Sequence, residues 1–478
     1  MTGEVPITVT GGAGGVAASY DDLATLGLLY GLLGGELIEA AWRDSLEAAD
    51  GDLVLSAVLS PTTFAEAEAE ILAATYGPHG LVSRAVLVEA QSFAFAAVVD
   101  LYRAADALQR AAYESLSYGL GLSLGLQVVP LTLTSGLALL VVRQADPVLA
   151  AGLDHDVVAF LEAHPEVVQT LANGAGGLLD GLGSLPVSGT LLRALGVEGP
   201  HLSTGSAAAD LGELLFGDRA GVAVPVHHEH PYAAPVRLED LVGDLAATAE
   251  GGDGAITVQR LVGADGDDRW VVHLPGTDTF ADDGRVRDMG SNLELMAGDD
   301  TAYGQGIEQA MGAAGVGPAD PVLMVGHSQG GMQAAALAGD PDFPYRVTHL
   351  VTAGAPVATS DLPDHVSALS LENSADLVPA LDGEPNRDRA SHTTVRADLR
   401  TGSLGAGGGN HGLALYAAVA GAADASEDPS VRAAISGMRD AGFWGATATQ
   451  TFAFRIDVAV EPGRSNIGGY PRVIDNAA

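Results

Sequence analysis

A short apolar segment that leads directly into a serine between two glycines narrows the folds open to this chain more than any other feature. Pro321–Val325 carries no charge and has the length of a buried strand, and Gly326-His327-Ser328-Gln329-Gly330 follows it at once. Small residues at 326, 330 and 331 permit a sharp turn and a close approach of strand and helix. The Ala-rich segment Met332–Leu337 has helical character. A strand, a tight turn and a helix in succession predict an α/β fold.

The same alternation extends over the C-terminal half of the chain. Apolar and β-branched runs predict strands, and Ala-rich or amphipathic runs between them predict helices. The expected strands are Ile256–Val262, Trp270–Leu274, Pro321–Val325, Val347–Thr352, Val366–Leu371, Thr393–Asp398 and Thr451–Val460, and the expected helices are Thr301–Ala314, Met332–Leu337 and Val431–Asp440. Because strands that alternate with helices form mainly parallel sheets, we expect one α/β domain over 231–478.

The N-terminal part predicts an all-α region. Residues 1–117 carry Ala-rich apolar runs with acidic residues at helical spacing, and the expected helices are Tyr20–Leu46, Thr63–Thr75 and Leu81–Leu116. Residues 144–230 predict a connector, with short helices as far as Leu195 and a loop from Gly196 to His230. The main domain boundary is therefore expected near residue 230.

An uncharged segment, 118–143, lies between these two parts. The 25 residues Tyr118–Val142 hold no charge and are long enough to cross a bilayer. Four glycines, Gln127 and Pro130 weaken that signal. Two interpretations therefore stay open, a membrane span or hairpin on one side and a pair of buried helices in a soluble protein on the other.

Charge and composition exclude several classes of protein. The formal net charge is −39, and all 22 basic residues are Arg, so we expect no binding to the phosphate backbone of nucleic acids. The chain has no Cys, which excludes disulfides, thiolate metal sites and cysteine nucleophiles. Hydrophobic residues make up 47% of the chain, enough for a sizeable core.

The N-terminus carries no pattern of a secretory signal peptide, since Met1–Thr10 lacks a basic segment followed by an apolar one. The helical region after it resembles the helical hairpins of proteins that actinobacterial type VII systems export, although Arg43-Asp44 follows Trp42 in place of a glycine motif. An accessory or oligomerisation region is the alternative. We expect a cytoplasmic or membrane-associated protein, with export that needs no signal peptide as a further option.

Ser328 is the candidate nucleophile. A serine hydroxyl needs a base to remove its proton and a tight turn to project it toward a carbonyl carbon. The same turn directs a helix N-terminus, with its N–H groups, toward a developing oxyanion. A second Gly-x-Ser-x-Gly match, Gly121-Leu122-Ser123-Leu124-Gly125, lies inside the uncharged segment without a strand before it, so we interpret Ser123 as a chance match.

An acid and a histidine are expected downstream of the serine, in that order. Asp376 follows the expected strand Val366–Leu371 and is the candidate to orient an imidazole. The competing acids are Glu372, Asp361, Asp364 and Asp382. His411 lies on a Gly-rich loop that leads into a helix, whereas His392 begins an expected strand, so His411 is the preferred base.

A second donor for an oxyanion hole is expected on an earlier strand-end loop. The strand Trp270–Leu274 runs directly into Pro275-Gly276-Thr277. The backbone N–H groups of Thr277 and Gln329 are the candidate donors.

These blocks together resemble the class 3 lipase-like branch of the α/β-hydrolases, over about 240 residues. The matching blocks, in family order, are Pro-Gly-Thr at 275–277, Gly-His-Ser-Gln-Gly at 326–330, Ala-Gly-Ala-Pro at 353–356 and Asp-Leu-Val-Pro at 376–379, with His411 and Tyr416 after them. Pro275 stands where such lipases usually carry Arg, and Gln329 in place of a common Leu is similar to cutinases and actinobacterial cell-envelope esterases.

The resemblance implies an α/β-hydrolase fold for 231–478 and hydrolysis of lipid-like carboxylic esters. It implies a triad of Ser328, Asp376 and His411 with oxyanion donors at Thr277 and Gln329, and it implies no metal or organic cofactor. Two alternatives stay open: an acyltransferase that uses the same triad, and an inert protein that serves secretion or a membrane scaffold.

Two further segments predict loops. His227-His228-Glu229-His230 places its side chains too close in sequence to surround one ion. Asp278–Asp288 lacks the spaced acids of a calcium loop, so we expect a mobile segment beside the oxyanion loop, as part of a lid.

Overall fold

The chain folds into two compact units in a computed structural model. The structure describes residues 5–47, 50–77, 79–131, 165–215, 219–227, 232–263, 265–278, 285–400 and 409–459. One unit consists of Gly11–Ser115 with Asp388–Ala390, and the described remainder forms the other, which we call the sheet unit.

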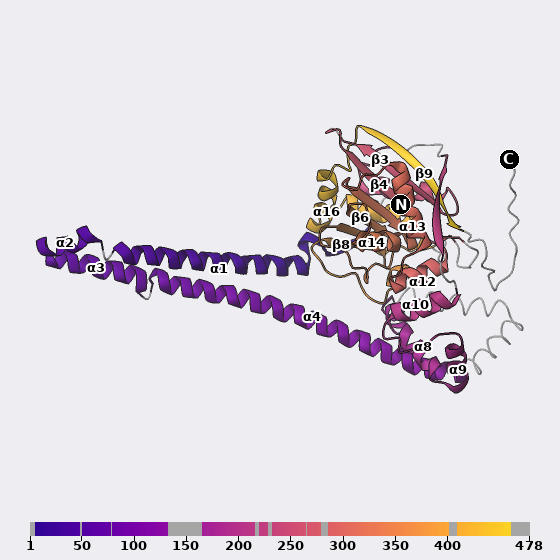
Figure 1. Ribbon diagram of the computed structural model, residues 1–478, viewed down its shortest axis with the longest axis horizontal. Coiled ribbons are helices and arrows are strands. Elements are labelled where there is room, and N and C mark those ends of the chain that lie inside the picture. The colour runs from indigo at the N-terminus through magenta and orange to yellow at the C-terminus, as the bar shows by residue number, and fades with distance from the viewer. Residues whose placement is uncertain are drawn as a thin grey trace, which may run out of the picture. The chain divides into compact units, whose positions relative to one another are not determined.

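The sheet unit is built on nine strands in the order β1-β8-β7-β6-β5-β4-β3-β9-β2. The strands are drawn as arrows in Figure 1. The strands are β1 (Ile7–Gly11), β2 (Ala220–Val226), β3 (Ala255–Val262), β4 (Asp268–Leu274), β5 (Val322–His327), β6 (Val347–Ala353), β7 (Ser367–Asn373), β8 (His392–Ala397) and β9 (Ala448–Ala459). Strands β4 to β8 pair in parallel, whereas β3, β9 and β2 add antiparallel pairs. The C-terminal half is therefore a mixed α/β fold with a mainly parallel central sheet.

Helices cover both faces of this sheet. One core cluster joins α13 (Ala302–Ala314) and α14 (Gln329–Gly339) to one face. The other joins α11 (Leu238–Ala249), α15 (Leu413–Asp424) and α16 (Pro429–Asp440) to the opposite face. Neighbouring residues of a strand enter different clusters, as period-2 geometry requires. A central strand covered on both faces must be apolar throughout, which explains the uninterrupted run in β5.

The expected strands and helices of 231–478 are confirmed to within a few residues at their ends. The interpretation of 196–230 as a loop was wrong, because it contains α10 (Thr204–Leu215) and β2. Pro225 lowers the strand signal of β2, yet β2 is an edge strand, where a missing N–H costs no ladder bond. The N-terminal region is also not wholly helical, since β1 joins the sheet beside β8.

Short helices precede β2 in the sequence and belong to the sheet unit. They are α7 (Pro165–Asn173), α8 (Ala175–Gly183), α9 (Pro186–Ala194) and α10, and α10 packs against α12 (Met289–Ala297). Their presence over 165–194 confirms the short helices expected there. The described part of the uncharged segment, 118–131, is the end of α4 (Leu81–Leu131), and residues 132–142 lie outside the described chain.

The other unit consists of helices, as the sequence predicted. They are α1 (Val16–Glu47), α2 (Gly51–Leu59), α3 (Pro61–Tyr76) and the first part of α4. A Cβ on Gly27 of α1 would lie 3.3 Å from the Phe95 Cβ of α4, so the missing side chain allows close packing of the two helices. The Tyr30 and Phe95 rings meet edge to face, 5.6 Å apart between centroids.

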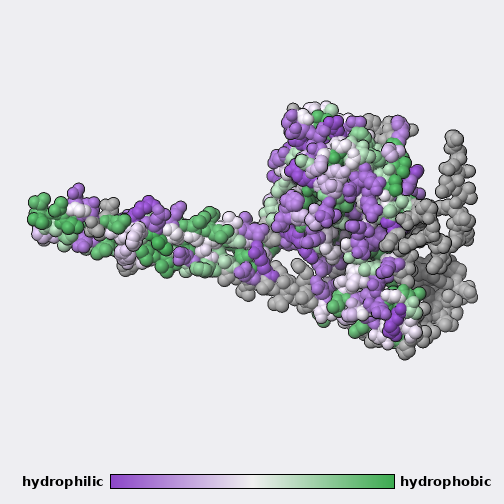
Figure 2. Space-filling view, in the orientation of Figure 1, coloured by the Kyte–Doolittle hydropathy of each residue, from purple (hydrophilic) through white to green (hydrophobic). Residues whose placement is uncertain are grey.

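Much apolar surface of this unit is exposed (Figure 2). Examples are Leu28, Leu32, Trp42, Leu55, Val58, Leu59 and Phe93, each more than 60% exposed. Two segments, Tyr20–Leu46 and Pro61–Asp100, are long and apolar enough to cross a membrane by length and composition, and residue 78 of the second lies outside the described residues. The uncharged segment Tyr118–Val142, for which a membrane span was one of two interpretations, is not among them, and only its first part lies within the described residues.

Candidate functional site

Ser328 lies at the junction between β5 and α14. Its backbone has φ 53° and ψ −125°, and it is the single non-glycine residue with positive φ among the described residues. Such a conformation costs about 1–3 kcal/mol and persists only where the surroundings enforce it. The flanking glycines explain how the turn closes, because a Cβ on Gly330 would lie 1.9 Å from the Leu274 carbonyl oxygen.

Three parallel strands end together beside this serine. The Ser328 N–H donates to the Ala353 carbonyl at the end of β6, at 3.0 Å. The Gly354 N–H donates in turn to the Leu371 carbonyl of β7, at 2.9 Å. Loops that follow β5, β6 and β7 therefore leave the sheet at one edge, and Asp376 lies on the loop after β7.

Asp376 and His411 are in direct contact. His411 Nδ1 and Asp376 Oδ2 are 2.6 Å apart, with the two residues 7% and 5% exposed. The Tyr416 hydroxyl donates to the same carboxylate oxygen at 2.5 Å, and the Val378 N–H donates to Oδ1 at 3.0 Å. These donors fix the orientation of the carboxylate, which in turn selects the tautomer of His411 with its Nε2 free to accept a proton.

Tyr416 reaches Asp376 because residue 354 has no side chain. A Cβ on Gly354 would lie 2.7 Å from atoms of the Tyr416 ring, and Gly354 has φ +60°. Burial, together with the Asp376 charge, raises the pKa of Tyr416 well above its usual value, so its hydroxyl stays a hydrogen-bond donor. The Ala-Gly-Ala-Pro block at 353–356 thus has a steric role in the site.

The competing acids have other partners or lie at the surface. Glu372 pairs with Arg396 at 2.6 Å, and Asp382 accepts the Ala358 N–H at 2.8 Å. Burial raises the pKa of Asp382 to about 7. Asp361 and Asp364 are exposed.

His392 also has another partner, away from Asp376. Its Nε2 lies 2.8 Å from the Ser370 hydroxyl inside the sheet. Among the predicted acids and histidines, the structure brings only Asp376 and His411 together.

Two residues without a predicted role hold the His411 loop. His327 Nε2 donates to the His411 carbonyl at 2.9 Å, and the two imidazole rings lie tilted by 32° with centroids 4.5 Å apart. Burial lowers the pKa of His327 to about 3, so this ring stays neutral and its Nε2 carries the proton. The Asn373 side chain donates to the carbonyls of Asn410 and Leu399, at 3.1 and 2.8 Å.

These contacts place the His411 loop beside the residue that precedes Ser328. No hydrogen bond joins Ser328 Oγ to His411 in the part of the chain that the structure describes. Such bonds are commonly long before a substrate binds. The position of His327 directly before the serine was the only sequence signal for its role.

The candidate oxyanion donors follow Ser328 in the chain and precede it on the loop after β4. The Gln329 N–H occupies the first position of α14, where helix geometry provides no acceptor. Thr277 follows Gly276, whose absent Cβ would lie 2.8 Å from the Ser328 Cβ. The Thr277 hydroxyl accepts from Asn292 Nδ2 at 3.1 Å. One candidate N–H therefore begins the helix after Ser328, and the other lies one residue beyond a glycine that packs against Ser328.

The predicted mobile segment is well held where it is described. Asp278 and Arg287 form a two-bond ion pair, and Asp288 is fully buried. Residues 279–284 lie outside the described chain. The described ends of 278–288 therefore differ from the expectation of a mobile loop.

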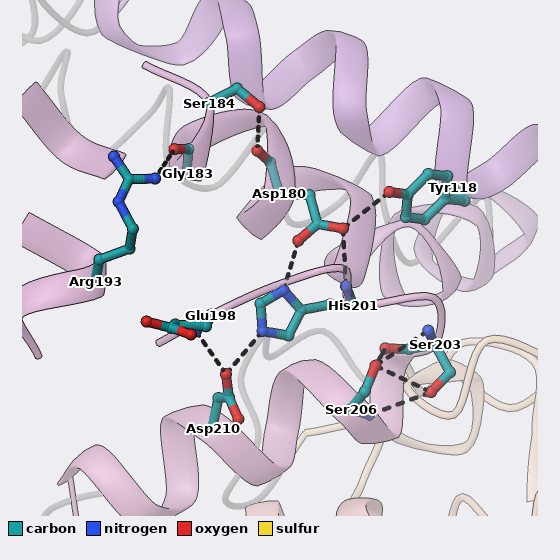
Figure 3. A network of polar contacts seen from close by, with 10 residues as sticks. All are labelled: Tyr118, Asp180, Gly183, Ser184, Arg193, Glu198, His201, Ser203, Ser206 and Asp210. Carbon is teal, nitrogen blue, oxygen red and sulfur yellow. Dashed lines mark hydrogen bonds and ion pairs between the residues drawn. The ribbon is translucent and has the colours of Figure 1, made fainter. Parts of the chain in front are cut away.

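A second polar cluster lies among the connector helices (Figure 3). His201 Nδ1 is 2.6 Å from Asp180 Oδ1, and its Nε2 is 2.9 Å from Asp210 Oδ2. The Tyr118 hydroxyl donates to Asp180 Oδ2 at 2.8 Å. Burial lowers the pKa of His201, but hydrogen bonds to Asp210 and Asp180 outweigh it and leave the pKa raised.

This cluster ties together the end of α4, α8, α10 and the loop that carries His201. It borders a cavity of about 460 Å³. The carboxylates of Asp180 and Asp210 are both bonded to the His201 ring, and the second oxygen of Asp180 accepts from the Tyr118 hydroxyl. We therefore interpret the cluster as a structural tie. Its residues lie up to 92 positions apart in the sequence (Tyr118 to Asp210), and no local sequence pattern predicts it.

The described residues contain no group of three or more His, Asp or Glu side chains that could hold a metal ion. Of the run at 227–230, only His227 lies within them. Compared with protein-family models, with curated proteins and with solved structures, the chain gives no significant match.

Proposed function

We propose that the sheet unit is an α/β-hydrolase that cleaves carboxylic esters through an acyl-enzyme. Ser328 Oγ attacks the ester carbonyl while His411 Nε2 takes its proton, and the tetrahedral oxyanion accepts from the N–H groups of Thr277 and Gln329. His411 then gives the proton to the leaving alcohol, and water repeats the sequence on the acyl-enzyme. Asp376 orients His411 and stabilises its cationic form.

One observation carries the proposal. A histidine and a carboxylate that lie 35 positions apart meet at 2.6 Å, beside the strand end where a serine adopts a strained turn. A structural Gly-rich turn has no need for positive φ at a serine, since glycine adopts that conformation without strain. The lipid-like nature of the ester rests on the resemblance to class 3 lipases.

Labelling with a fluorophosphonate tests the proposal, because the probe reacts covalently with an activated serine. We expect wild-type protein to be labelled and Ser328→Ala not to be. Ser123→Ala is the matched control, since it removes a serine from the same Gly-x-Ser-x-Gly pattern, and it should label like wild type. Labelling that survives Ser328→Ala would refute the assignment of the nucleophile.

Product analysis separates a hydrolase from an acyltransferase. Wild-type protein is incubated with an activated ester in water and again with an added acceptor alcohol. Free acid as the main product in both reactions supports the hydrolase. A new ester as the main product with the alcohol supports the acyltransferase. Labelled Ser328 without turnover of any of a panel of esters would favour an inert protein.

A further inference from the structure

Two consecutive buried residues, Arg287 and Asp288, hold both sides of the proposed oxyanion hole. Arg287 Nε and Nη2 donate to the Asp278 carboxylate at 2.9 and 2.6 Å, and Asp278 directly follows Thr277. The Asp288 carbonyl accepts from the Gln329 side-chain amide at 2.8 Å. Arg287 is 1% exposed and Asp288 is 0% exposed. Both candidate donors are thus tied, directly or through a neighbour, to one dipeptide.

Asp278 has no freedom to move without breaking several bonds. Its N–H donates to the Arg287 carbonyl at 2.8 Å, and its Oδ2 accepts the Gly254 N–H at 2.9 Å. Arg287 Nη2 also donates to the Gly252 carbonyl at 2.9 Å. A planar guanidinium that binds a carboxylate at two points fixes its direction as well as its distance. The direction of the residue before Asp278 is therefore fixed too.

The same loop is held on the side that precedes Thr277. The buried Tyr303 hydroxyl donates to the Pro275 carbonyl at 3.4 Å. Asn292, on α12, donates to the Thr277 hydroxyl. Since α12 begins immediately after Asp288, the dipeptide also sets the position of Asn292. Thr277 is thereby restrained from both sides and at its side chain.

The charges of the dipeptide are matched inside the fold. Burial raises the pKa of Asp278, and the Arg287 charge opposes that rise. Asp288 pairs with Arg219 at 2.6 Å. A buried ion pair adds little net stability compared with apolar residues of the same size. The two-point contact between Arg287 and Asp278 restricts the directions in which both side chains can lie. A role in positioning therefore explains these pairs better than a role in stability.

We propose that Arg287 is a positioning residue for ester hydrolysis, which holds the Thr277 N–H toward the oxyanion through the Asp278 carboxylate. This inference rests on the proposed function. It assigns Arg287 no contact with the substrate, so substrate binding should depend on it far less than the stabilisation of the transition state.

Two variants test the role. Arg287→Lys keeps the charge but loses the two-point contact with Asp278. Arg287→Met/Asp278→Asn removes both charges, and an Asn at 278 still accepts the Gly254 N–H, so no charge is left buried and unpaired. We expect kcat to fall about 10- to 100-fold in both, with KM changed less than about threefold, as for a displaced oxyanion donor.

A thionoester substrate distinguishes a positioning role of Arg287 from a purely structural one. Sulfur accepts hydrogen bonds weakly, so a thionoester gains little from an oxyanion hole. The ratio of kcat for an oxoester to kcat for the matched thionoester should therefore drop with kcat in both variants. Arg269→Lys is the matched control, because Arg269 binds Asp265 through two bonds, at 3.0 and 2.6 Å, near the opposite end of β4.

The outcomes separate this inference from the proposed function. Wild-type protein without Ser328-dependent turnover refutes the proposed function and the inference with it. An active wild type whose folded Arg287 variants keep both kcat and the substrate ratio refutes the inference alone. If Arg287→Lys does not fold, the double variant decides. A fall of the ratio in Arg269→Lys as well would also overturn the specific role of Arg287.

Discussion

The backbone of Ser328 predicts that glycine at this position stabilises the sheet unit. With φ 53° and ψ −125°, any residue with a Cβ is strained here by about 1–3 kcal/mol, whereas glycine is not. Glycine loses about 0.5–1 kcal/mol through the greater freedom of the unfolded chain. Ser328→Gly should therefore be more stable than Ser328→Ala by roughly 0.5–2 kcal/mol. Alanine is the proper reference because both variants lack the hydroxyl.

Thermal and urea unfolding measure this difference. Of the three Trp residues, Trp270 and Trp444 belong to the sheet unit and Trp42 to the other. In a Trp42→Phe background, fluorescence therefore reports the sheet unit alone. For a unit of this size each kcal/mol shifts Tm by about 1–2 °C.

A serine with an ordinary backbone provides the control. Ser360 has no positive φ, so Ser360→Gly should be less stable than Ser360→Ala by about 0.5–1 kcal/mol. If glycine is also the less stable choice at 328, by the same margin as at 360, the turn stores no strain and the reasoning is wrong. Both 328 variants should fail to react with a fluorophosphonate, whatever their stability.

Three further predictions follow from contacts around the site and the connector. Tyr416→Phe removes the hydroxyl bonded to Asp376. It should lower the free energy of unfolding by about 1–3 kcal/mol and kcat for an ester about tenfold. Unchanged urea unfolding and unchanged kinetics would contradict this prediction. Gly354→Ala places a Cβ against the Tyr416 ring at positive φ and should lower the free energy of unfolding in urea by at least about 2 kcal/mol. An unchanged or raised free energy of unfolding would count against it. The folded pKa of His201 is raised above 6.5, so its contribution to stability is fully present below pH 6.5 and is lost as the pH rises through the folded pKa. The Tm of wild type should therefore exceed that of His201→Gln by more at pH 6 than at pH 9. An equal difference at both pH values would rule out a charged His201 in the cluster.

Local signals in the sequence predicted the elements that position the candidate site. The apolar run of β5, the small residues around Ser328 and the Ala-rich α14 each specify their own conformation, and the structure has all three. Edge strands were harder to predict. Strand β2 contains Pro225, and β1 is far from the other strands in the sequence. Only the position of β2 beside β9 and of β1 beside β8 makes them part of the sheet.

The contacts that hold the site were not predictable in the same way. Asn373 and His327 act on the loop of His411 over 37 and 84 positions, and Arg287 acts on Asp278 across a segment interpreted as mobile. Asn373 and Arg287 are common residue types that no spacing marks, and His327 was marked only by its position directly before Ser328. Their roles follow from the edge of the sheet, where loops from several parallel strands meet, and this requires the strand order.

The two matches to Gly-x-Ser-x-Gly show why the pattern alone cannot identify a nucleophile. Ser123 lies inside α4, where a helical residue has its N–H bonded to the carbonyl four positions earlier. No N–H group there is free to bind an oxyanion. Ser328 precedes the first turn of α14, where the N–H groups lack intrahelical partners. The position of a serine relative to a helix N-terminus, which the strand before it determines, therefore decides whether the same five residues could support acyl transfer.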